Sequence, residues 1–158
     1  MTLNEKGYFL LIASRSEDLH GKSITGEEMA KRRLEAKEWG FYANTPHKGK
    51  IKKGDQVIVY LAGPKDMKFF ATATAGDIHQ NTRSYTADGD ALTDIPVAVL
   101  SLSDVFFFKK QTMIHEVKDA LDFIPKATNK WGCVLQRGLK MISQKDAETI
   151  LKYSTLQQ

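Results

Sequence analysis

The sequence predicts an α+β fold, in which a curled β-sheet or small β-barrel is flanked by a few helices. Short apolar segments rich in branched and aromatic residues recur along the chain and predict strands at 8–13, 39–43, 56–62, 69–75, 95–100 and 105–108, with a last extended piece at 131–135. Helical patterns are few and lie between or after these segments. Neither a repeat nor a shift in composition marks a second domain, so we expect one domain spanning 1–158.

The strongest strand pattern, 56–62, follows a Lys-Gly-Asp turn at 53–55. Turn residues at 63–66 separate it from 69–75, and two strands so close in sequence predict a β-hairpin. The polar residues 101–104 interrupt the apolar run that begins at 95, so we expect two separate strands there.

Three segments carry helix signals. Thr25 and Glu28 have the spacing of a capping box, and the strong helix formers after them predict a surface helix over about 27–37. The apolar stripe expected on that helix is thin and consists of Met29, Arg33, Ala36 and Lys37. Residues 115–121 fit a short helix, and Ser143 as N-cap predicts a final helix that runs to about residue 153.

The composition is that of an ordinary globular protein, with 42% apolar and 27% charged residues. The net charge of +4 and the pI of about 9.1 suit a nucleic-acid partner, although many proteins that bind small anions share them. A single cysteine, Cys133, excludes an internal disulfide framework and a multi-thiolate zinc site. No segment approaches the roughly 20 apolar residues that span a bilayer, and the N-terminal residues lack a signal-peptide pattern. We therefore expect a soluble, cytoplasmic protein without a membrane partner.

Motifs for the common enzyme chemistries are missing from the sequence. It contains neither a glycine-rich phosphate loop nor a nucleophile elbow. The four histidines lack the close spacing of metal ligands, and Cys133 is typical of a small buried residue. Loop ordering and the electrostatics of a helix start explain the carboxylate pairs Glu17–Asp18 and Glu27–Glu28. We therefore expect no catalytic residue, no metal and no cofactor.

Aromatic side chains at strand positions, with polar and basic residues nearby, form the remaining signal. Base recognition needs flat rings for stacking, polar groups for the base edge and cations for the phosphates. The rings are Trp39, Phe41, Tyr42, Tyr60, Phe69, Phe70 and Trp131. The residues suited to contact a nucleic-acid backbone are His47, Lys48, Lys50, Lys52 and Lys53, with Arg15, Arg32 and Arg33 as further cations. The same pattern also fits aromatic residues in a core and lysines in solvent, so both interpretations stay open.

Several segments, taken in order, resemble the EVE domains of the PUA-like superfamily and, more distantly, YTH domains. The matching segments are 8–18, 39–45, 51–62, 69–75 and 132–147. The closest correspondence is Ile51-Lys-Lys-Gly-Asp-Gln-Val-Ile-Val-Tyr-Leu-Ala62, a Lys-Gly-Asp turn followed by an apolar strand. The resemblance implies a PUA-like curled β-barrel with flanking helices and a pocket that receives a flipped base, modified in some members.

The resemblance also implies roles for individual residues. Ser14, Arg15 and Ser16 would lie at the mouth of the pocket, and Arg137 would face the nucleic-acid backbone or the pocket. Trp39 and residues 41–45 would form one wall, with Tyr60 or Phe69 closing another side. The base pocket expected on this basis comprises Ser14, Arg15, Ser16, Trp39, Phe41, Tyr42, Asn44, Thr45, Tyr60 and Phe69.

The leading function is therefore a non-enzymatic module that binds DNA or RNA and recognises a base. One alternative is an enzyme that acts on nucleic acid or nucleotides, for which Glu17, Asp18 and His47 are the residues to inspect. Another is a module for small ligands or proteins, whose basic surface is merely solvated. The choice between DNA and RNA, the base and the oligomeric state stay open.

Overall fold

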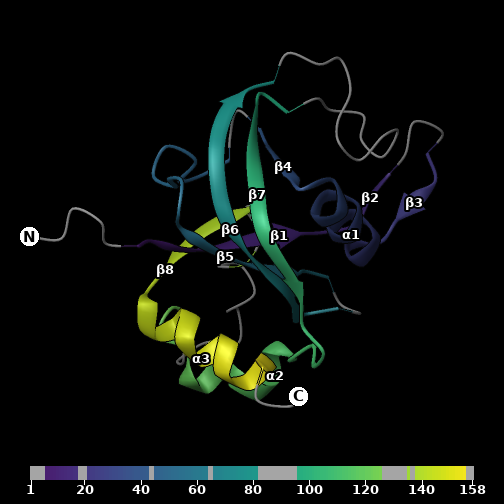
Figure 1. Ribbon diagram of the computed structural model, residues 1–158. Helices are drawn as coiled ribbons and strands as arrows, with labels where there is room; N and C mark the ends of the chain where they lie inside the picture. Colours follow the sequence, from purple (N-terminus) through teal and green to yellow (C-terminus); the bar gives the residue numbers. More distant parts are fainter. Residues whose placement is uncertain are drawn as a thin grey trace, which may run out of the picture.

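A curled, mixed β-sheet organises the computed structural model, which describes residues 6–17, 21–42, 45–63, 66–81, 96–125, 135 and 138–155 (Figure 1). The six strands lie in the order β4 (Glu38–Phe41), β7 (Ala98–Phe107), β6 (Lys68–Gln80), β5 (Gln56–Leu61), β1 (Tyr8–Ala13) and β8 (Leu139–Ile142). β1 and β5 are parallel, and every other neighbouring pair is antiparallel. A separate two-stranded ribbon consists of β2 (Ser16–Glu17) and β3 (Ser23–Ile24). The α+β class and the curled sheet, which forms a half-barrel, are confirmed.

Irregularities in the strand register bend this sheet. The pairing of β5 with β6 shifts between Val59 and Tyr60, and the pairing of β6 with β7 shifts twice. At one of these shifts Asp104 adopts a left-handed backbone conformation with φ 49°. An extra residue in one strand increases local twist and bends the strand, which lets a sheet curl.

The irregularity at Asp104 also corrects a prediction. The separate strands expected at 95–100 and 105–108 form one continuous strand, β7, because a bulge absorbs the polar interruption without ending the ladder. The partner strand β6 likewise continues to Gln80, past the expected end at residue 75. β8 and the β2–β3 ribbon were not predicted, and the strand-like piece expected at 131–135 lies outside the described residues except for Leu135.

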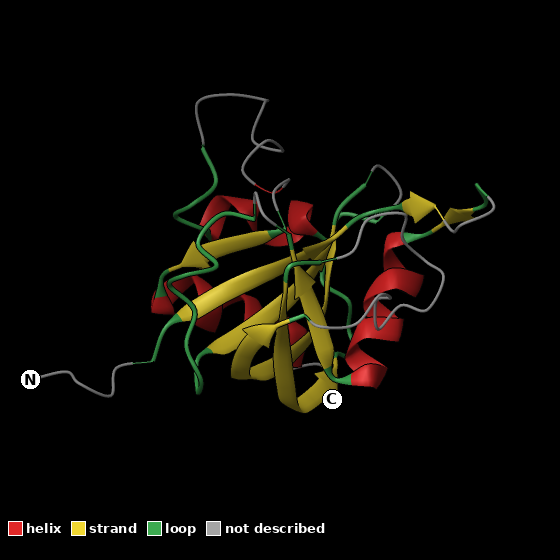
Figure 2. Ribbon diagram, turned by 90° about the horizontal axis from the view of Figure 1, so that it is seen from above, coloured by secondary structure: helices red, strands yellow, loops and turns green. Residues whose placement is uncertain are grey.

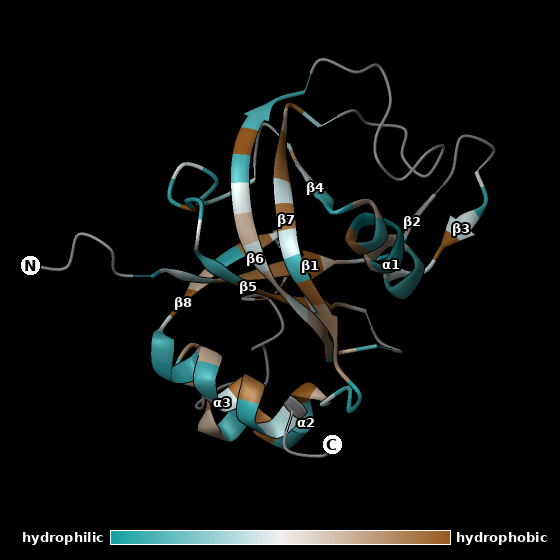
Figure 3. Cartoon of the chain, in the orientation of Figure 1, coloured by the Kyte–Doolittle hydropathy of each residue, from teal (hydrophilic) through white to brown (hydrophobic). Residues whose placement is uncertain are grey.

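The two faces of the sheet bury two separate cores. One core, which we call the inner core, includes Val57, Val59 and Leu61 of β5. The core on the other face, which we call the outer core, includes Ile58 and Tyr60 of the same strand. This is the alternation expected of a strand whose side chains point to opposite faces. Figure 3 shows the resulting pattern, with apolar central strands and more polar outer segments.

Helix α1 (Gly26–Ala36) closes the inner core. The Thr25 hydroxyl accepts a hydrogen bond from the Glu28 backbone N–H at 3.1 Å, which confirms Thr25 as the N-cap. The helix lies at the surface, with Met29, Ala30, Arg33 and Leu34 on its buried face and Lys31 and Glu35 exposed. The stripe predicted with Ala36 and Lys37 was therefore misplaced by part of a turn.

The outer core is covered by α2 (Ile114–Val117), the 3₁₀ turn η1 (Lys118–Ala120) and α3 (Gln144–Thr155). The Ser143 hydroxyl accepts from the Asp146 backbone N–H at 3.1 Å, so the predicted cap of the last helix is confirmed. Figure 2 shows that α1 and the β2–β3 ribbon lie together at one side of the sheet. Within the described part of the chain, no helix combines the length and apolar character needed to cross a bilayer.

Candidate nucleic-acid interface

The first predicted site residues lie where β1 meets the start of α1. A Cβ added at Gly26 would lie 3.2 Å from the Ala13 carbonyl oxygen and 3.4 Å from the Ser14 Cα. Glycine therefore allows the helix to begin directly against the end of the strand. Ser14 and Arg15 follow β1 at this point and are exposed to solvent.

The same end of the sheet brings in residues that are far apart in sequence. Ala13 pairs with Leu61 at the end of β5, and Leu61 pairs with Lys68 at the start of β6. The Lys68 ammonium lies 3.7 Å from the Glu27 carboxylate in the first turn of α1. The Lys68 side chain is only 22% exposed, so this ion pair ties β6 to the helix at the edge of the inner core.

The end of β7 adds an aromatic ring to this region. Phe107 pairs with Ala71, and its ring meets that of Phe70 edge to face at 5.5 Å between centroids. Phe70 is buried in the inner core, whereas Phe107 is 46% exposed. We call Ser14, Arg15, Glu27, Lys68 and Phe107 the α1 end of the sheet.

Trp39 lies deeper and further along α1. It is 2% exposed and packs in the inner core with Phe41, and the Arg33 guanidinium lies over its ring at 4.9 Å from the centroid. Arg33 is seven positions after Gly26, which corresponds to roughly 10 Å along an α-helix. Trp39 and Ser14 thus contact opposite parts of the same helix.

The turn after β4 is held by its own polar groups. The Tyr42 backbone N–H donates to the Thr45 hydroxyl at 2.8 Å, and the Thr45 N–H donates to the Tyr42 carbonyl oxygen at 3.0 Å. The Lys48 ammonium also donates to that carbonyl, at 3.0 Å. Thr45 and Lys48 therefore stabilise the predicted pocket wall itself.

Tyr60 and Phe69 lie on the opposite face of the sheet from Trp39. They are 2% and 0% exposed, and their rings pack in the outer core at 5.1 Å between centroids. Burial raises the pKa of the Tyr60 hydroxyl well above its usual range, and the nearby Asp66 carboxylate raises that pKa further. The sheet separates both rings from Trp39, so the structure does not bring them together into one pocket with it.

Two of the predicted backbone-contacting lysines, Lys52 and Lys53, lie at the other end of β1. The Asp55 carboxylate accepts from the backbone N–H of Gly7, just before β1, and from that of Lys52, both at 2.9 Å. Lys52 and Lys53 are exposed on this turn, which Figure 1 shows on the side of the sheet away from α1. Since a strand rises about 3.3 Å per residue, β1 separates them from Arg15 by roughly 20 Å.

The remaining predicted residues are distributed as follows. His47 and Lys50 are exposed in the turn before β5, whereas Asn44, Arg137 and the side chain of Ser16 lie outside the described residues.

Two of the residues considered for catalysis belong to different elements. Glu17 is in β2, and its side chain lies outside the described residues, whereas His47 is exposed in the turn before β5. Asp18 and Cys133 lie outside the described residues. Among the described residues, no group of three or more His, Cys, Asp or Glu side chains is placed to hold a metal ion.

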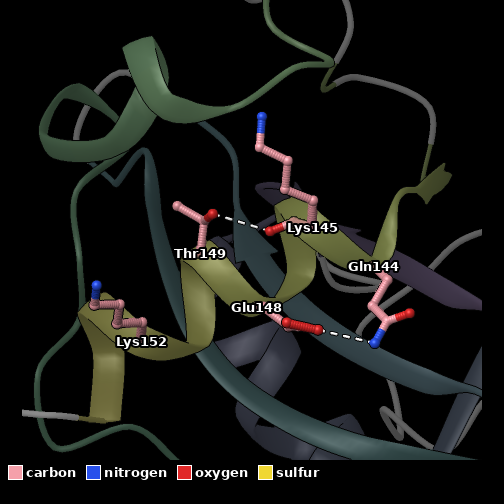
Figure 4. A pocket seen from close by; sticks show the side chains of 5 residues that line it. All are labelled: Gln144, Lys145, Glu148, Thr149 and Lys152. Carbon is pink, nitrogen blue, oxygen red and sulfur yellow. Dashed lines mark hydrogen bonds between the residues drawn. The ribbon is translucent and has the colours of Figure 1, made fainter.

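A surface hollow of about 430 Å³ lies on the outer side of α3 (Figure 4). It is lined by Gln144, Lys145, Glu148, Thr149 and Lys152. The Gln144 amide donates to the Glu148 carboxylate, and the Thr149 hydroxyl donates to the Lys145 carbonyl oxygen, both at 2.9 Å. All five residues come from one helix and none is aromatic, so the hollow lacks the rings that stack on a base.

Comparison with known proteins adds information on the fold alone. No protein-family model matches the chain, and no curated protein matches it in sequence. A structure of human THYN1 protein in complex with DNA containing 5-methylcytosine matches with a TM-score of 0.64 and 11% identity, over 94% of this chain and 98% of that one. The YTH domain of Zygosaccharomyces rouxii MRB1 protein, in complex with N6-methyladenosine RNA, matches with a TM-score of 0.59 and 10% identity, over 98% and 90%. An ASCH structure from Zymomonas mobilis matches with a TM-score of 0.59 and 12% identity, over 94% and 96%.

The chain has a PUA-like fold. The resemblance to EVE domains seen in the sequence is thus confirmed at the level of the fold.

Within this PUA-like fold, sequence reasoning missed Lys68 and Phe107 at the α1 end. Lys68 directly precedes a strand and reads as an ordinary turn lysine. Phe107 stands inside a run of three phenylalanines, a pattern that predicts burial rather than exposure. Only the strand register shows that the two residues share a face of the sheet.

Proposed function

We propose that residues 1–158 form one non-enzymatic module that binds nucleic acid and recognises a modified base extruded from the strand. The observation that carries this proposal is the fold. It is shared with the THYN1 structure that holds 5-methylcytosine DNA and with the YTH structure that holds N6-methyladenosine RNA. The α1 end of the sheet is the proposed point of contact.

The residues at this end suit the task. Extruding a base costs a few kcal/mol, which stacking and hydrogen bonds to the base edge must offset. Ser14 offers a hydroxyl for the base edge, and Arg15 offers a cation for a phosphate. Ala13, which directly precedes Ser14, belongs to the inner core.

Binding measurements on paired oligonucleotides test the proposal. DNA strands with or without 5-methylcytosine and RNA strands with or without N6-methyladenosine are titrated at two salt concentrations, about 50 mM and about 200 mM. We expect one modified strand to bind more tightly than its unmodified partner, and affinity to fall steeply with salt because phosphate contacts release counterions. Equal affinity for every modified and unmodified pair would refute base recognition.

Charge removal at the two ends of β1 locates the contact. Arg15→Ala should weaken binding of a short strand and reduce the slope of log affinity against log salt by about one phosphate contact. Lys52→Ala, about 20 Å away, is the matched control and should leave a short strand unaffected. The opposite result would move the site to the Lys52 end.

Trp39→Ala is a poor test of recognition. Trp39 is buried with the inner core, and truncating a buried tryptophan typically costs 3–5 kcal/mol of stability, roughly enough to unfold a marginal domain. A loss of binding would then report unfolding. The absence of turnover is tested separately, by recovering each oligonucleotide after long incubation with pure protein. Cleaved or altered strands would favour the enzyme alternative.

A further inference from the structure

Two neighbouring phenylalanines of β7 are exposed on opposite faces of the sheet. Phe106 pairs with Thr72 and is 65% exposed, whereas Phe107 pairs with Ala71 and is 46% exposed. Ala71 belongs to the inner core, so Phe107 faces the same side as Lys68 and α1. Phe106, next along the strand, faces away from it because successive side chains alternate.

Phe107 is both oriented and accessible. Its edge-to-face contact with Phe70, at 5.5 Å and 82° between ring planes, fixes the ring against the core. Along the edge of β7 that pairs with β4, the ladder ends at Ser101. Just beyond it, the Leu102 N–H donates to the carbonyl oxygen of Lys37, the residue before β4. Within the described residues, no strand continues along this edge as far as Phe107.

The surroundings of Phe107 carry charges that suit a nucleic-acid strand. Lys68 stands on the same face, near the start of β6, and Lys109 is exposed just after β7. Through Ala71 and Val59, Phe107 lies level with Leu11 of β1. Arg15 is three strands away from Phe107 and four residues beyond Leu11, which together correspond to roughly 20 Å. At about 3.4 Å per nucleotide of a stacked strand, this distance is roughly six nucleotides.

We propose that Phe107 is a stacking platform for a base that neighbours the recognised base along the strand. This inference rests on the proposed function. It adds a second contact to the same site, made with the nucleotide next to the extruded base in the nucleic-acid strand. A ring that is held by the core and open on one side stacks on any base, because every base has an aromatic face.

A contact between two copies of the chain fits the same region less well. A stable dimer buries roughly 800 Å² on each partner. The exposed part of one phenylalanine ring supplies on the order of 100 Å². Stacking of a single base needs no more than that area.

The experiment compares two ligands and four variants by fluorescence titration. The ligands are a short strand with one central modified base, 5-methylcytosine in DNA or N6-methyladenosine in RNA, and the corresponding modified mononucleotide. Phe107→Ala should weaken binding of the strand by roughly 5- to 100-fold, leaving the mononucleotide and the ratio of modified to unmodified strand unchanged. Phe107→Tyr should bind as the wild type does, and Phe107→Leu, which keeps apolar contact with Phe70, should bind as weakly as Phe107→Ala.

Phe106→Ala is the matched control, since it removes a more exposed ring from the same strand on the other face. It should leave binding unchanged. The inference is overturned if Phe107→Leu binds the strand normally, if Phe106→Ala weakens binding equally, or if the variants abolish a dimer seen by sedimentation. A wild-type protein that ignores base modification but loses affinity in Phe107→Ala would refute the proposed function and still support the platform.

Discussion

Replacing Asp55 with alanine should destabilise the protein strongly. The Asp55 side chain is 3% exposed and accepts hydrogen bonds from the backbone N–H groups of Gly7 and Lys52, both at 2.9 Å. It thereby joins the chain before β1 to the turn before β5, and these two strands are parallel neighbours in the sheet. A Cβ at Gly7 would lie 3.0 Å from the carboxylate, so the backbone approaches it closely.

The size of the effect follows from the donors left without a partner. Each unsatisfied buried N–H costs about 1–3 kcal/mol, and partial access of water to the turn favours the lower half of that range. Asp55→Ala should therefore cost about 2–4 kcal/mol. Asp55→Asn retains one acceptor oxygen but turns an NH₂ group toward the other donor, so we expect an intermediate loss.

Urea unfolding monitored by circular dichroism measures this loss. With a denaturant dependence of about 2 kcal/mol/M, the midpoint of Asp55→Ala should fall by about 1–2 M. Asp77→Ala is the control, because its carboxylate is 76% exposed and lies 4.0 Å from the Lys53 ammonium. We expect that variant to change by less than about 0.5 kcal/mol. An Asp55→Ala midpoint equal to that of the control would refute this account of the Lys-Gly-Asp turn.

Three further substitutions test the packing around the sheet. Burial raises the pKa of the Tyr60 hydroxyl, so the folded state favours its protonated form. This contribution to stability is complete below the unfolded pKa of about 10 and is lost as pH rises above that value. In guanidinium unfolding, Tyr60→Phe should therefore lose less stability than the wild type between neutral and strongly alkaline pH, and equal losses would contradict this reasoning. Lys37 ends α1 with φ 57°, so Lys37→Gly should raise the free energy of unfolding by about 0.5 kcal/mol, and a drop would show that the left-handed position carries no strain. Asp146, 1% exposed, accepts from the backbone N–H groups of Asp122 and Phe123, so Asp146→Ala should cost about 2–4 kcal/mol in urea unfolding, whereas a wild-type midpoint would show that water replaces the carboxylate.

Local patterns predicted the elements well where the deciding interaction is itself local. The caps at Thr25 and Ser143 were correct because each hydroxyl bonds to a backbone N–H only three residues away. The break expected inside β7 was wrong because a bulge at Asp104 depends on the register of the neighbouring strand. The same limit explains the missed β8, whose short ladder forms with the distant β1.

For the candidate site, the sequence indicates position along the chain but not the face of the sheet. Ser14 and Arg15 directly follow the end of a strand and are exposed, and their role at a pocket mouth stays a prediction. Trp39 and Tyr60 look equivalent in sequence, since both are aromatic residues at strand positions. They lie in different cores because a side chain's face follows from its register in the sheet.

The sequence by itself determined the α+β class, the capped helices, most of the strands and the Lys-Gly-Asp turn. Each of these depends on residue spacings of two to four positions or on a short motif. Only the tertiary structure decided which residues lie at the same end of the sheet. Arg15 follows β1, whereas Lys68 and Phe107 belong to β6 and β7, and no local spacing encodes the strand order that brings these ends together. It separated Lys52 and Lys53 from the predicted pocket mouth for the same reason, since the two groups stand at opposite ends of β1.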